Sequence, residues 1–462
     1  MSETGGGAPR RGRGKRLPAR SGLSAPAFVA VALSVAAPAG AAGAPLYRCP
    51  PLEQSARDSA APGGLSQGLD GWFFRGPRAG PRSDLAQAMR PGPEALALLG
   101  RLGALLAARG VRFVVVPLPP RGLVAAAALD GGVDDQAVFD AAVAGAGYGS
   151  LIAGLRSAGL AVAGLEPRDV AGLPDPGFYF RRAEGVTVDG GWLIATRVAR
   201  LLSPGLLTGG APPPEGTPHA AGGAMAQVLE RLCTDPLPAE TAAPRKALPP
   251  APGAAPLAIA GAESDAGGAI DFAGLMTSAT GHPARIEAGP DPVSALLGYL
   301  ESPRFQQTPP AVLVWVVPAA WFADLGIVDL WRLTAAAAGD CAGTARQAGH
   351  AALLPGGAGL ALPSPAQGRY AAVLHLPAGD ADGRITLLTQ NGKAPQGLSA
   401  LPLVASRQAG VPNPLYIAPD DLAPLTGAAT ARMVSFVWPE GRPAQPVAVT
   451  LCRLPDTSQA AP

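Results

Sequence analysis

Two long apolar runs, each closed by proline, restrict this chain to folds that contain a buried sheet. They are VRFVVVPLPP at 111–120 and AVLVWVVP at 311–318. Apolar residues occupy nearly every position of both runs, which is typical of strands covered on both faces. Strands with one exposed face would alternate apolar and polar residues. The two runs therefore predict strands at the centre of a layered domain.

Helical and strand-like segments alternate around these runs. Residues 94–109 and 150–158 carry apolar side chains at helical spacing, and the first of these segments ends at Gly110. Further strands are expected at 160–165 and 256–261, and further helices at 224–233 and 269–281. This alternation predicts an α/β fold with helices on the faces of the sheet.

The composition allows a sizeable core despite many loop-forming residues. The chain has 462 residues with 61 Gly and 52 Pro, but 48% of its residues are hydrophobic and only 15% are charged. The glycine and proline concentrate in long loops, including an insertion expected at 203–256. The formal net charge of +2 argues against an electrostatic nucleic-acid binder.

The first 44 residues have the layout of a secretory signal peptide. A basic segment between Arg10 and Arg20 precedes an apolar, alanine-rich segment, and AGA at 42–44 offers a small-residue cleavage site. The alternative is an uncleaved membrane anchor, which Pro26 and Pro38 disfavour because they interrupt the apolar segment. We expect residues 1–44 to be a signal peptide that exports the chain.

Four cysteines form an even set, as expected for an oxidising compartment. Three pairings are possible, and the placement of the cysteines suggests Cys49–Cys233 and Cys341–Cys452. Zinc binding is the rival interpretation. No two cysteines and no histidine have ligand spacing, so we expect neither a metal nor a cofactor.

The sequence pattern changes near residue 360. Short strands split by Gly, Pro and Asn turns follow, and no convincing helix intervenes. Residues 360–455 are therefore expected to form a small antiparallel β-sandwich.

The segment FYFRRAEGVTVDGGW at 178–192 has the layout of an active-site segment whose catalytic residues are missing. An aromatic strand end leads into Arg181 and Arg182, and a helical run follows the turn. Many enzymes place a charged base in such a turn, but here the turn holds Ala183, Gly185 and Val186.

The chain resembles the AlgX/AlgJ family of periplasmic alginate and exopolysaccharide O-acetyltransferases. The resemblance rests on the order of several motifs together with the four cysteines: GLDGWFF, VRFVVVPLPPRG, GFYFRR…DGGW, LAIAGAESD…IDFAGLM and ALLGYLESPRFQQTPPAVLVWVVP. It implies an SGNH-hydrolase-like parallel-sheet domain over 45–345 and a carbohydrate-binding-module-like sandwich over 360–455. It also implies the cysteine pairing suggested above.

The resemblance further implies a serine, a histidine and an aspartate that act together. The family normally carries an Asp-x-His-Trp pattern, whose aspartate and histidine positions fall on Ala183 and Gly185. A second family pattern, Gly-Thr-Ser-Tyr, places its serine on Glu263, and Ser264 follows one residue later. A serine hydroxyl is a poor nucleophile without a positioned base, so these departures predict a degenerate catalytic site.

Three functions stay open at this point. The chain is expected to be a periplasmic, catalytically degenerate component that binds polysaccharide or supports assembly. Alternatively, Ser264 acts as a shifted nucleophile in an active O-acetyltransferase or esterase, although Ser264 and Asp265 also suit a helix cap. As a third alternative, the chain is a purely structural subunit of a secretion complex.

Binding residues and partners follow from the same hypothesis. Arg181 and Arg182 could pair with carboxylates or phosphates, or they could be an ordinary solvated strand end. Trp192 could stack on a sugar or pack in the core. The expected partners are an acidic or neutral exopolysaccharide and a membrane-bound O-acyltransferase or other secretion protein, and no nucleic acid is expected.

Overall fold

A computed structural model describes residues 49, 51–52, 64–129, 139–174, 177–203, 213–233, 240–261 and 270–339, and strands further along the chain. The predicted signal peptide at 1–44 lies outside the described residues. Within them, no helix is both long enough and apolar enough to cross a membrane.

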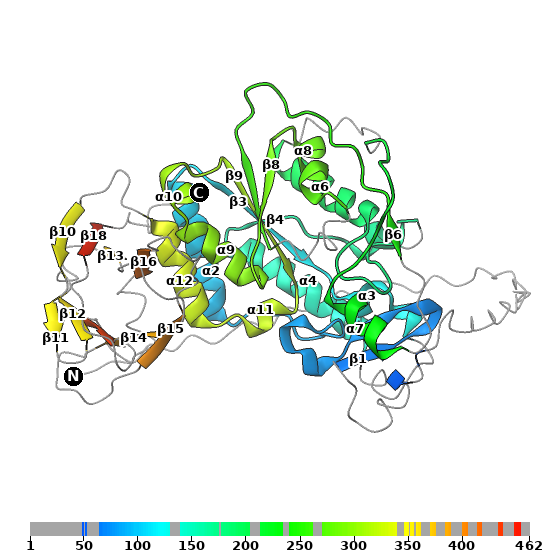
Figure 1. The fold of residues 1–462 in the computed structure, drawn as a ribbon, viewed down its shortest axis with the longest axis horizontal. Coiled ribbons are helices and arrows are strands. Elements are labelled where there is room, and N and C mark those ends of the chain that lie inside the picture. Colours follow the sequence, from blue (N-terminus) through cyan, green and yellow to red (C-terminus); the bar gives the residue numbers. More distant parts are fainter. Residues whose placement is uncertain are drawn as a thin grey trace, which may run out of the picture. The chain divides into compact units, whose positions relative to one another are not determined.

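A parallel five-stranded sheet forms the centre of the first part of the chain (Figure 1). Every neighbouring pair in this sheet is parallel. The strand order is β4 (Ala161–Val162), β3 (Arg112–Leu118), β9 (Val312–Pro318), β7 (Leu257–Ala260) and β8 (Ala284–Glu287). The two apolar runs are the adjacent strands β3 and β9 near the middle of the sheet, as the sequence predicts.

Side chains from successive residues of the central strands enter two different cores. Phe113 and Val115 of β3 lie in one apolar cluster, whereas Val114 and Val116 lie in another. Both clusters are buried, which explains why these strands tolerate almost no polar residue. The first cluster includes residues of α2 (Pro93–Ala108), α4 (Ala141–Ser157), α9 (Pro292–Glu301) and α12 (Ile327–Ala338). The second includes residues of α6 (Val188–Leu202) and α8 (Phe272–Thr280).

Most predicted elements of this part are confirmed, with shifted bounds. The helix expected at 94–109 is α2, and the helices expected at 224–233 and 269–281 are α7 (Ala224–Leu232) and α8. The helix expected at 150–158 is longer, because α4 begins at Ala141. The Asp140 side chain caps it by accepting from the amides of Ala142 and Val143 at 2.8 and 3.1 Å. The glycine-rich first turns obscured this start in the sequence.

Short elements connect the larger ones. The remaining helices are α3 (Arg121–Val124), α5 (Pro167–Ala171), α10 (Pro303–Gln307) and α11 (Trp321–Asp324). Short 3-10 segments occur at η2 (Leu69–Gly71), η3 (Pro77–Arg82, kinked at Gly80) and η4 (Ala126–Ala128). The expected insertion at 203–256 contains α7 and a two-stranded antiparallel sheet of β5 (His219–Ala220) and β6 (Thr241–Ala242).

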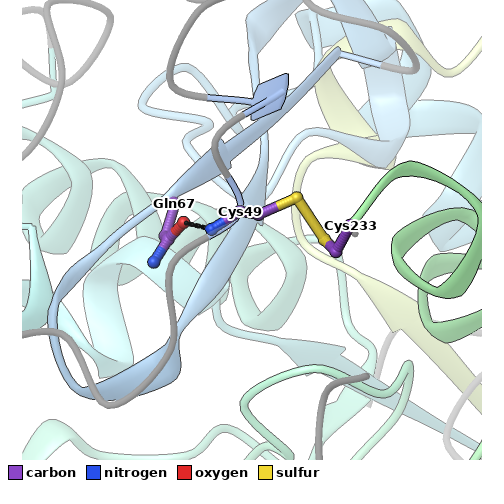
Figure 2. The surroundings of a disulfide bond; sticks show 3 residues. All are labelled: Cys49, Gln67 and Cys233. Carbon is purple, nitrogen blue, oxygen red and sulfur yellow. Dashed lines mark hydrogen bonds between the residues drawn. A yellow bond between two sulfur atoms is a disulfide. The ribbon is translucent and has the colours of Figure 1, made fainter. Parts of the chain in front are cut away.

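A disulfide joins the N-terminal residues to the insertion. Cys49 bonds to Cys233, which directly follows α7, across 184 residues of sequence. Figure 2 shows this bond and the hydrogen bond that the Cys49 amide donates to Gln67 Oε1 at 3.0 Å. Gln67 ends β1 (Leu65–Gln67), which pairs with β2 (Phe73–Arg75) in a hairpin. The predicted Cys49–Cys233 pair is confirmed. Cys341 lies outside the described residues, so its pairing with Cys452 stays a prediction.

The C-terminal strands form two antiparallel sheets. The sheet orders are β10-β18-β13-β16 and β11-β12-β17-β14-β15. The strand bounds are β10 Arg346–His350, β11 Ala352–Leu354, β12 Gly357–Ala361, β13 Tyr370–His375, β14 Arg384–Thr389, β15 Ala400–Val404, β16 Pro414–Ile417, β17 Met433–Val437 and β18 Ala448–Arg453. The sheets include strands that begin before residue 360. Their packing as a β-sandwich stays a prediction.

Candidate functional site

A narrow pocket lies at the carboxyl ends of the two central strands. Leu118 and Pro318 are register partners at the last position of β3 and β9, and both line the pocket. Ligands of open α/β sheets bind at this edge. We call it the edge pocket and define it by its lining residues: Arg75, Arg82, Ser83, Asp84, Leu118, Pro119, Pro120, Arg121, Tyr179, Gly185, Pro318, Ala319 and Ala320.

One wall of the edge pocket comes from the segment that precedes α6. Tyr179 and Val186 form an isolated antiparallel bridge, and the Thr187 amide donates to Phe178 O at 2.9 Å. Thr187 then caps α6 by accepting from the Gly190 amide at 3.1 Å. The loop between the bridge partners contains Ala183 and Gly185, where the resemblance leads us to expect the family's aspartate and histidine.

Neither of these positions supplies an ionisable side chain. Ala183 is 1% exposed, and its carbonyl accepts from Arg121 Nη2 at 3.0 Å. Gly185 lines the edge pocket and has a φ of 89°, in the left-handed region that favours glycine. The loop therefore shapes the pocket with backbone atoms where the resemblance implies a base.

The serine position falls on a segment that the structure does not describe. Glu263 and Ser264 both lie within residues 262–269, outside the described residues. The preceding strand β7 ends at Ala260, beside Trp315 of β9. Gly261 follows with a φ of 86°, and a Cβ atom there would lie 2.1 Å from Val316 O. Only glycine fits this close approach of the two neighbouring segments.

Neither His282 nor His219 is among the residues that line the edge pocket. His282 precedes β8, whose first residue, Ala284, pairs with Leu257 at the start of β7. It therefore lies at the amino end of the parallel strands, opposite the pocket. Its Nδ1 is 2.8 Å from Ala255 O. His219 is exposed on β5.

The predicted binding residues Arg181, Arg182 and Trp192 contact other residues near the edge pocket. Arg181 donates from Nη1 to Asp70 O at 2.9 Å, and Arg182 Nε lies 4.0 Å from Glu240 Oε2. Trp192 is partly buried in α6 and packs against the second core cluster. None of the three is among the residues that line the edge pocket. Their roles in polymer binding stay predictions.

A cluster of ion pairs beneath the pocket was not predicted from the sequence. Arg75 Nη2 lies 3.3 Å from Asp84 Oδ1, and its Nη1 lies 3.2 Å from Glu184 Oε1. Arg121 Nε lies 3.8 Å from Asp84 Oδ2. The sequence did contain a signal for this cluster. Arg121 comes three residues after the last residue of an apolar strand, where α/β proteins place functional side chains.

Arg121 is almost completely buried, with 3% of its surface exposed. Its guanidinium donates to the carbonyls of Phe180 and Ala183 and lies 5.2 Å from the ring centre of Tyr179. Burial lowers the pKa of Arg121 from its ordinary value, and the Asp84 carboxylate acts in the opposite direction. Burial also raises the pKa of Tyr179, whose hydroxyl donates to Pro119 O at 2.6 Å. This arrangement holds a cation at the base of the pocket.

A metal site is not apparent in the described part of the chain. There, no group of three or more His, Cys, Asp or Glu side chains is placed to hold a metal ion.

Comparisons with known proteins identify relatives of this architecture. The sequence profile of the family described as "SGNH hydrolase-like domain, acetyltransferase AlgX" matches residues 65–319. The matched range contains the five parallel strands and every residue that lines the edge pocket except Ala320. No curated protein sequence matches the chain.

Two solved structures are similar to this one. AlgX from Pseudomonas aeruginosa superimposes with a TM-score of 0.62 at 21% identity, covering 85% of this chain and 94% of that chain. The O-acetyltransferase domain of AlgJ from Pseudomonas putida gives a TM-score of 0.43 at 21% identity, covering 59% of this chain and 98% of that chain. The first similarity supports the fold described above.

Proposed function

This chain belongs to the family of the SGNH hydrolase-like domain of the acetyltransferase AlgX, and from that premise we propose that it is a non-catalytic member. In this proposal it acts in the periplasm, in the O-acetylation of an exopolysaccharide. It binds the polymer or a partner of the acetylation machinery and does not transfer acetyl groups itself.

The observation that carries this proposal is Gly185 on the wall of the edge pocket. We expect the family's histidine base at this position, where the pocket receives only backbone. If the Asp-x-His-Trp pattern is instead aligned on Trp192, the histidine falls on Gly191, which also lacks a base. A serine hydroxyl needs a positioned base to lose its proton during attack. His219 and His282 do not line the pocket. Loss of the base therefore supports a non-catalytic role.

The other polar groups around the pocket are poor substitutes for a base. Asp84 accepts from the Arg75 amide at 2.7 Å and pairs with the guanidinium groups of Arg75 and Arg121. Glu184 pairs with Arg75 and accepts from the Ala224 amide at 2.9 Å. The oxygens of both carboxylates are thus occupied by guanidinium and amide groups, so neither carboxylate is positioned to take a proton from a serine hydroxyl.

The hydroxyl of Ser83, which lines the pocket, is also held by local hydrogen bonds. Ser83 Oγ lies 3.4 Å from Arg75 O and accepts from the Leu85 amide at 3.2 Å. These contacts support a role for Ser83 in shaping the loop, not in attacking an ester.

Export is part of the proposal. The Cys49–Cys233 disulfide supports folding in an oxidising compartment such as the periplasm, which the predicted signal peptide at 1–44 would reach. We also propose that the two antiparallel sheets of the C-terminal part form a β-sandwich that binds carbohydrate. Arg181, Arg182 and Trp192 are proposed as further contacts for the polymer.

Mass spectrometry of the intact protein tests the absence of catalysis. The full chain is incubated with an activated acetyl ester, and the wild type is compared with Ser264→Ala. We expect no ester hydrolysis above a buffer blank and no difference between the two proteins. A stoichiometric acetyl adduct on Ser264 that turns over would show an active O-acetyltransferase or esterase and would overturn the proposal.

Affinity electrophoresis of the full chain tests the binding role. Gels containing alginate, an acetylated glucan or the host's own exopolysaccharide are compared with a polymer-free gel. Retardation by at least one polymer is expected. Absence of retardation in every gel would leave a purely structural subunit, in contact with a membrane-bound O-acyltransferase or another secretion protein.

A further inference from the structure

A proline-rich segment of the insertion lies exposed on the surface. It reads KALPPAP at 246–252, between β6 and β7 (Figure 1), and each of its seven residues is exposed. Leu248 exposes 47% of its surface and is one of two large apolar side chains that are exposed among the described residues. The segment therefore presents a continuous apolar surface with a single positive charge at its start.

Hydrogen bonds hold this segment against the body of the protein. Three of its amides donate at 2.8 Å to atoms outside the segment: Lys246 to Pro214 O, Leu248 to Ser278 Oγ and Ala251 to Gly281 O. A turn in which the Ala254 amide donates to Ala251 O at 3.1 Å ends the segment. The backbone of this segment is thus fixed, although residues 246–251 belong to no helix or strand.

The spacing of its side-chain contacts indicates an extended backbone. A Cβ atom on Gly274 of α8 would lie 2.9 Å from Ala247 Cβ, and one on Gly281, directly after α8, would lie 3.6 Å from Ala251 Cβ. The two glycines are about 10 Å apart at the rise of an α-helix, and four residues of α-helix would cover only about 6 Å. Four residues of polyproline II helix cover about 12 Å, which fits. Proline favours the same conformation at its own position and at the preceding residue.

A polyproline II helix has three residues per turn, so its side chains form three edges. The first edge holds Lys246, Pro249 and Pro252, the second holds Leu248 and Ala251, and the third holds Ala247 and Pro250. Ala251 of the second edge and Ala247 of the third approach α8 and the glycine that follows it. The first edge, with one lysine and two prolines, therefore faces away from the body, and the exposed Leu248 lies beside it.

We propose that the segment 246–252 is a docking site for a partner domain whose groove is lined by aromatic side chains and carries a carboxylate at one end. Grooves of this kind bind polyproline II segments in which prolines recur every three residues. Pro249 and Pro252 have this spacing, and Lys246 lies where it pairs with the carboxylate of the groove. The fixed backbone reduces the conformational entropy that binding costs.

This docking site is separate from the edge pocket. None of residues 246–252 lines that pocket. The proposal thus goes beyond the proposed function, and it does not depend on whether the chain binds a polymer.

Titration of an isotope-labelled SH3 domain with the full chain tests the docking site. The domain chosen as the probe prefers two prolines three residues apart, preceded by a basic residue, and its amide signals in an NMR spectrum report where the chain binds. We expect saturable changes confined to the aromatic groove. A variant of the domain without the groove tryptophan is the blank and should show no such changes.

Three variants of the chain locate the contact. Pro249→Ala should weaken binding about tenfold, because it removes a proline from the outward edge. Lys246→Gln should weaken it about threefold and reduce its dependence on salt. Pro250→Ala is the matched control: it removes a neighbouring exposed proline from the third edge, and the affinity should stay within about twofold. All three positions are exposed, so the variants should fold as the wild type does, which thermal unfolding checks.

Several results would overturn the proposal. Absence of saturable binding at domain concentrations up to about 1 mM would exclude a usable docking site. Equal affinities of Pro249→Ala and Pro250→Ala would exclude recognition of the outward edge, and signal changes outside the groove would exclude the groove as the contact. None of these results would alter polymer retardation or the absence of acetyl transfer, so this inference and the proposed function fail separately.

Discussion

The carboxylate of Glu240 accepts a hydrogen bond from the backbone amide of Ala183 at 3.0 Å. The same carboxylate accepts from the amides of Arg181 and Arg182, both at 2.7 Å. Three successive amides thus surround one carboxylate, in a concave arrangement that favours anions. Glu240 belongs to the insertion, so this contact fastens the insertion to the loop that lines the edge pocket.

Removal of this carboxylate should destabilise the protein. Glu240→Ala leaves three partly buried amides without their acceptor, and we expect the free energy of unfolding to fall by about 2–4 kcal/mol. Glu240→Gln keeps one side-chain oxygen and should lose less. Chemical denaturation measures both changes. Glu230→Ala, at an exposed position of α7, should change stability by less than about 0.5 kcal/mol, and a loss equal to that of Glu240→Ala would contradict the assignment.

The confirmed disulfide should contribute strongly to stability. Cys49 and Cys233 close a loop of 184 residues, and the chain-entropy model gives a contribution of about 5 kcal/mol. The double variant Cys49→Ser/Cys233→Ser should therefore show a clearly lower thermal midpoint under non-reducing conditions. An unchanged midpoint would show that packing around β1 and α7 is sufficient without the bond.

Non-reducing peptide mapping should recover two linked pairs of peptides. One contains Cys49 and Cys233, and the other contains Cys341 and Cys452. A peptide that joins Cys49 to Cys341, or Cys233 to Cys452, would contradict the predicted pairing.

Restoring the histidine at position 185 should cost stability. Gly185 has a φ of 89°, and a side chain with a Cβ atom is strained in this region by about 1–2 kcal/mol. Gly185→His should therefore lower the free energy of unfolding by roughly this amount, and Gly185→Ala should do the same. Gly149→Ala is the control, because Gly149 lies in α4 with open space around it. It should be neutral or stabilise by up to about 1 kcal/mol.

The strain at position 185 should also hinder reconstruction of the serine, histidine and aspartate group. Ala183→Asp, Gly185→His and Glu263→Ser together should yield little acetyl transfer unless the loop backbone also changes, and no single substitution should yield any. Ester hydrolysis by the three-residue variant, with each single variant as a comparison, measures this. Efficient transfer by Gly185→His alone would contradict the geometric argument.

Buried tyrosines should make the fold sensitive to alkali. Burial raises the pKa of Tyr148 and Tyr179 above the ordinary range and that of Tyr299 to about 12. The unfolded chain loses these protons near pH 10, before the folded chain does. Stability should therefore fall as the pH rises above 10, by up to about 1.4 kcal/mol per pH unit for each tyrosine.

Tyrosinate absorbance near 295 nm checks this expectation directly. In the folded protein, at most three of the six tyrosines should ionise with an ordinary pKa, and all six should do so in denaturant. Tyr299→Phe should remove one late-ionising group. Ionisation of all six tyrosines together near pH 10 in the folded protein would show that the three are not buried as described.

Local pattern was sufficient to predict the central sheet and much of its surroundings. The apolar runs of β3 and β9 identify buried strands because a sheet covered on both faces excludes polar side chains from nearly every position. The periodicity of α2 is an equally local signal. The expectation that Ser264 or Asp265 caps the next helix was wrong for α8, because Asp271 caps that helix by accepting from the Gly274 amide at 3.0 Å. The absence of a histidine at position 185 is also readable from the chain alone, because no fold can restore a side chain that the sequence lacks.

Contacts between distant segments were decided by the tertiary structure. Glu240 reaches Ala183 across 57 residues, and Arg75 reaches Glu184 across 109. His282 follows a helix close to the serine segment in sequence, yet it lies at the opposite end of the parallel strands. The sequence by itself determined which segments are buried and which chemistry is missing, since burial and residue identity are local properties. Only the tertiary structure decided which charges meet at the edge pocket, because strand order brings together residues whose spacing along the chain carries no signal.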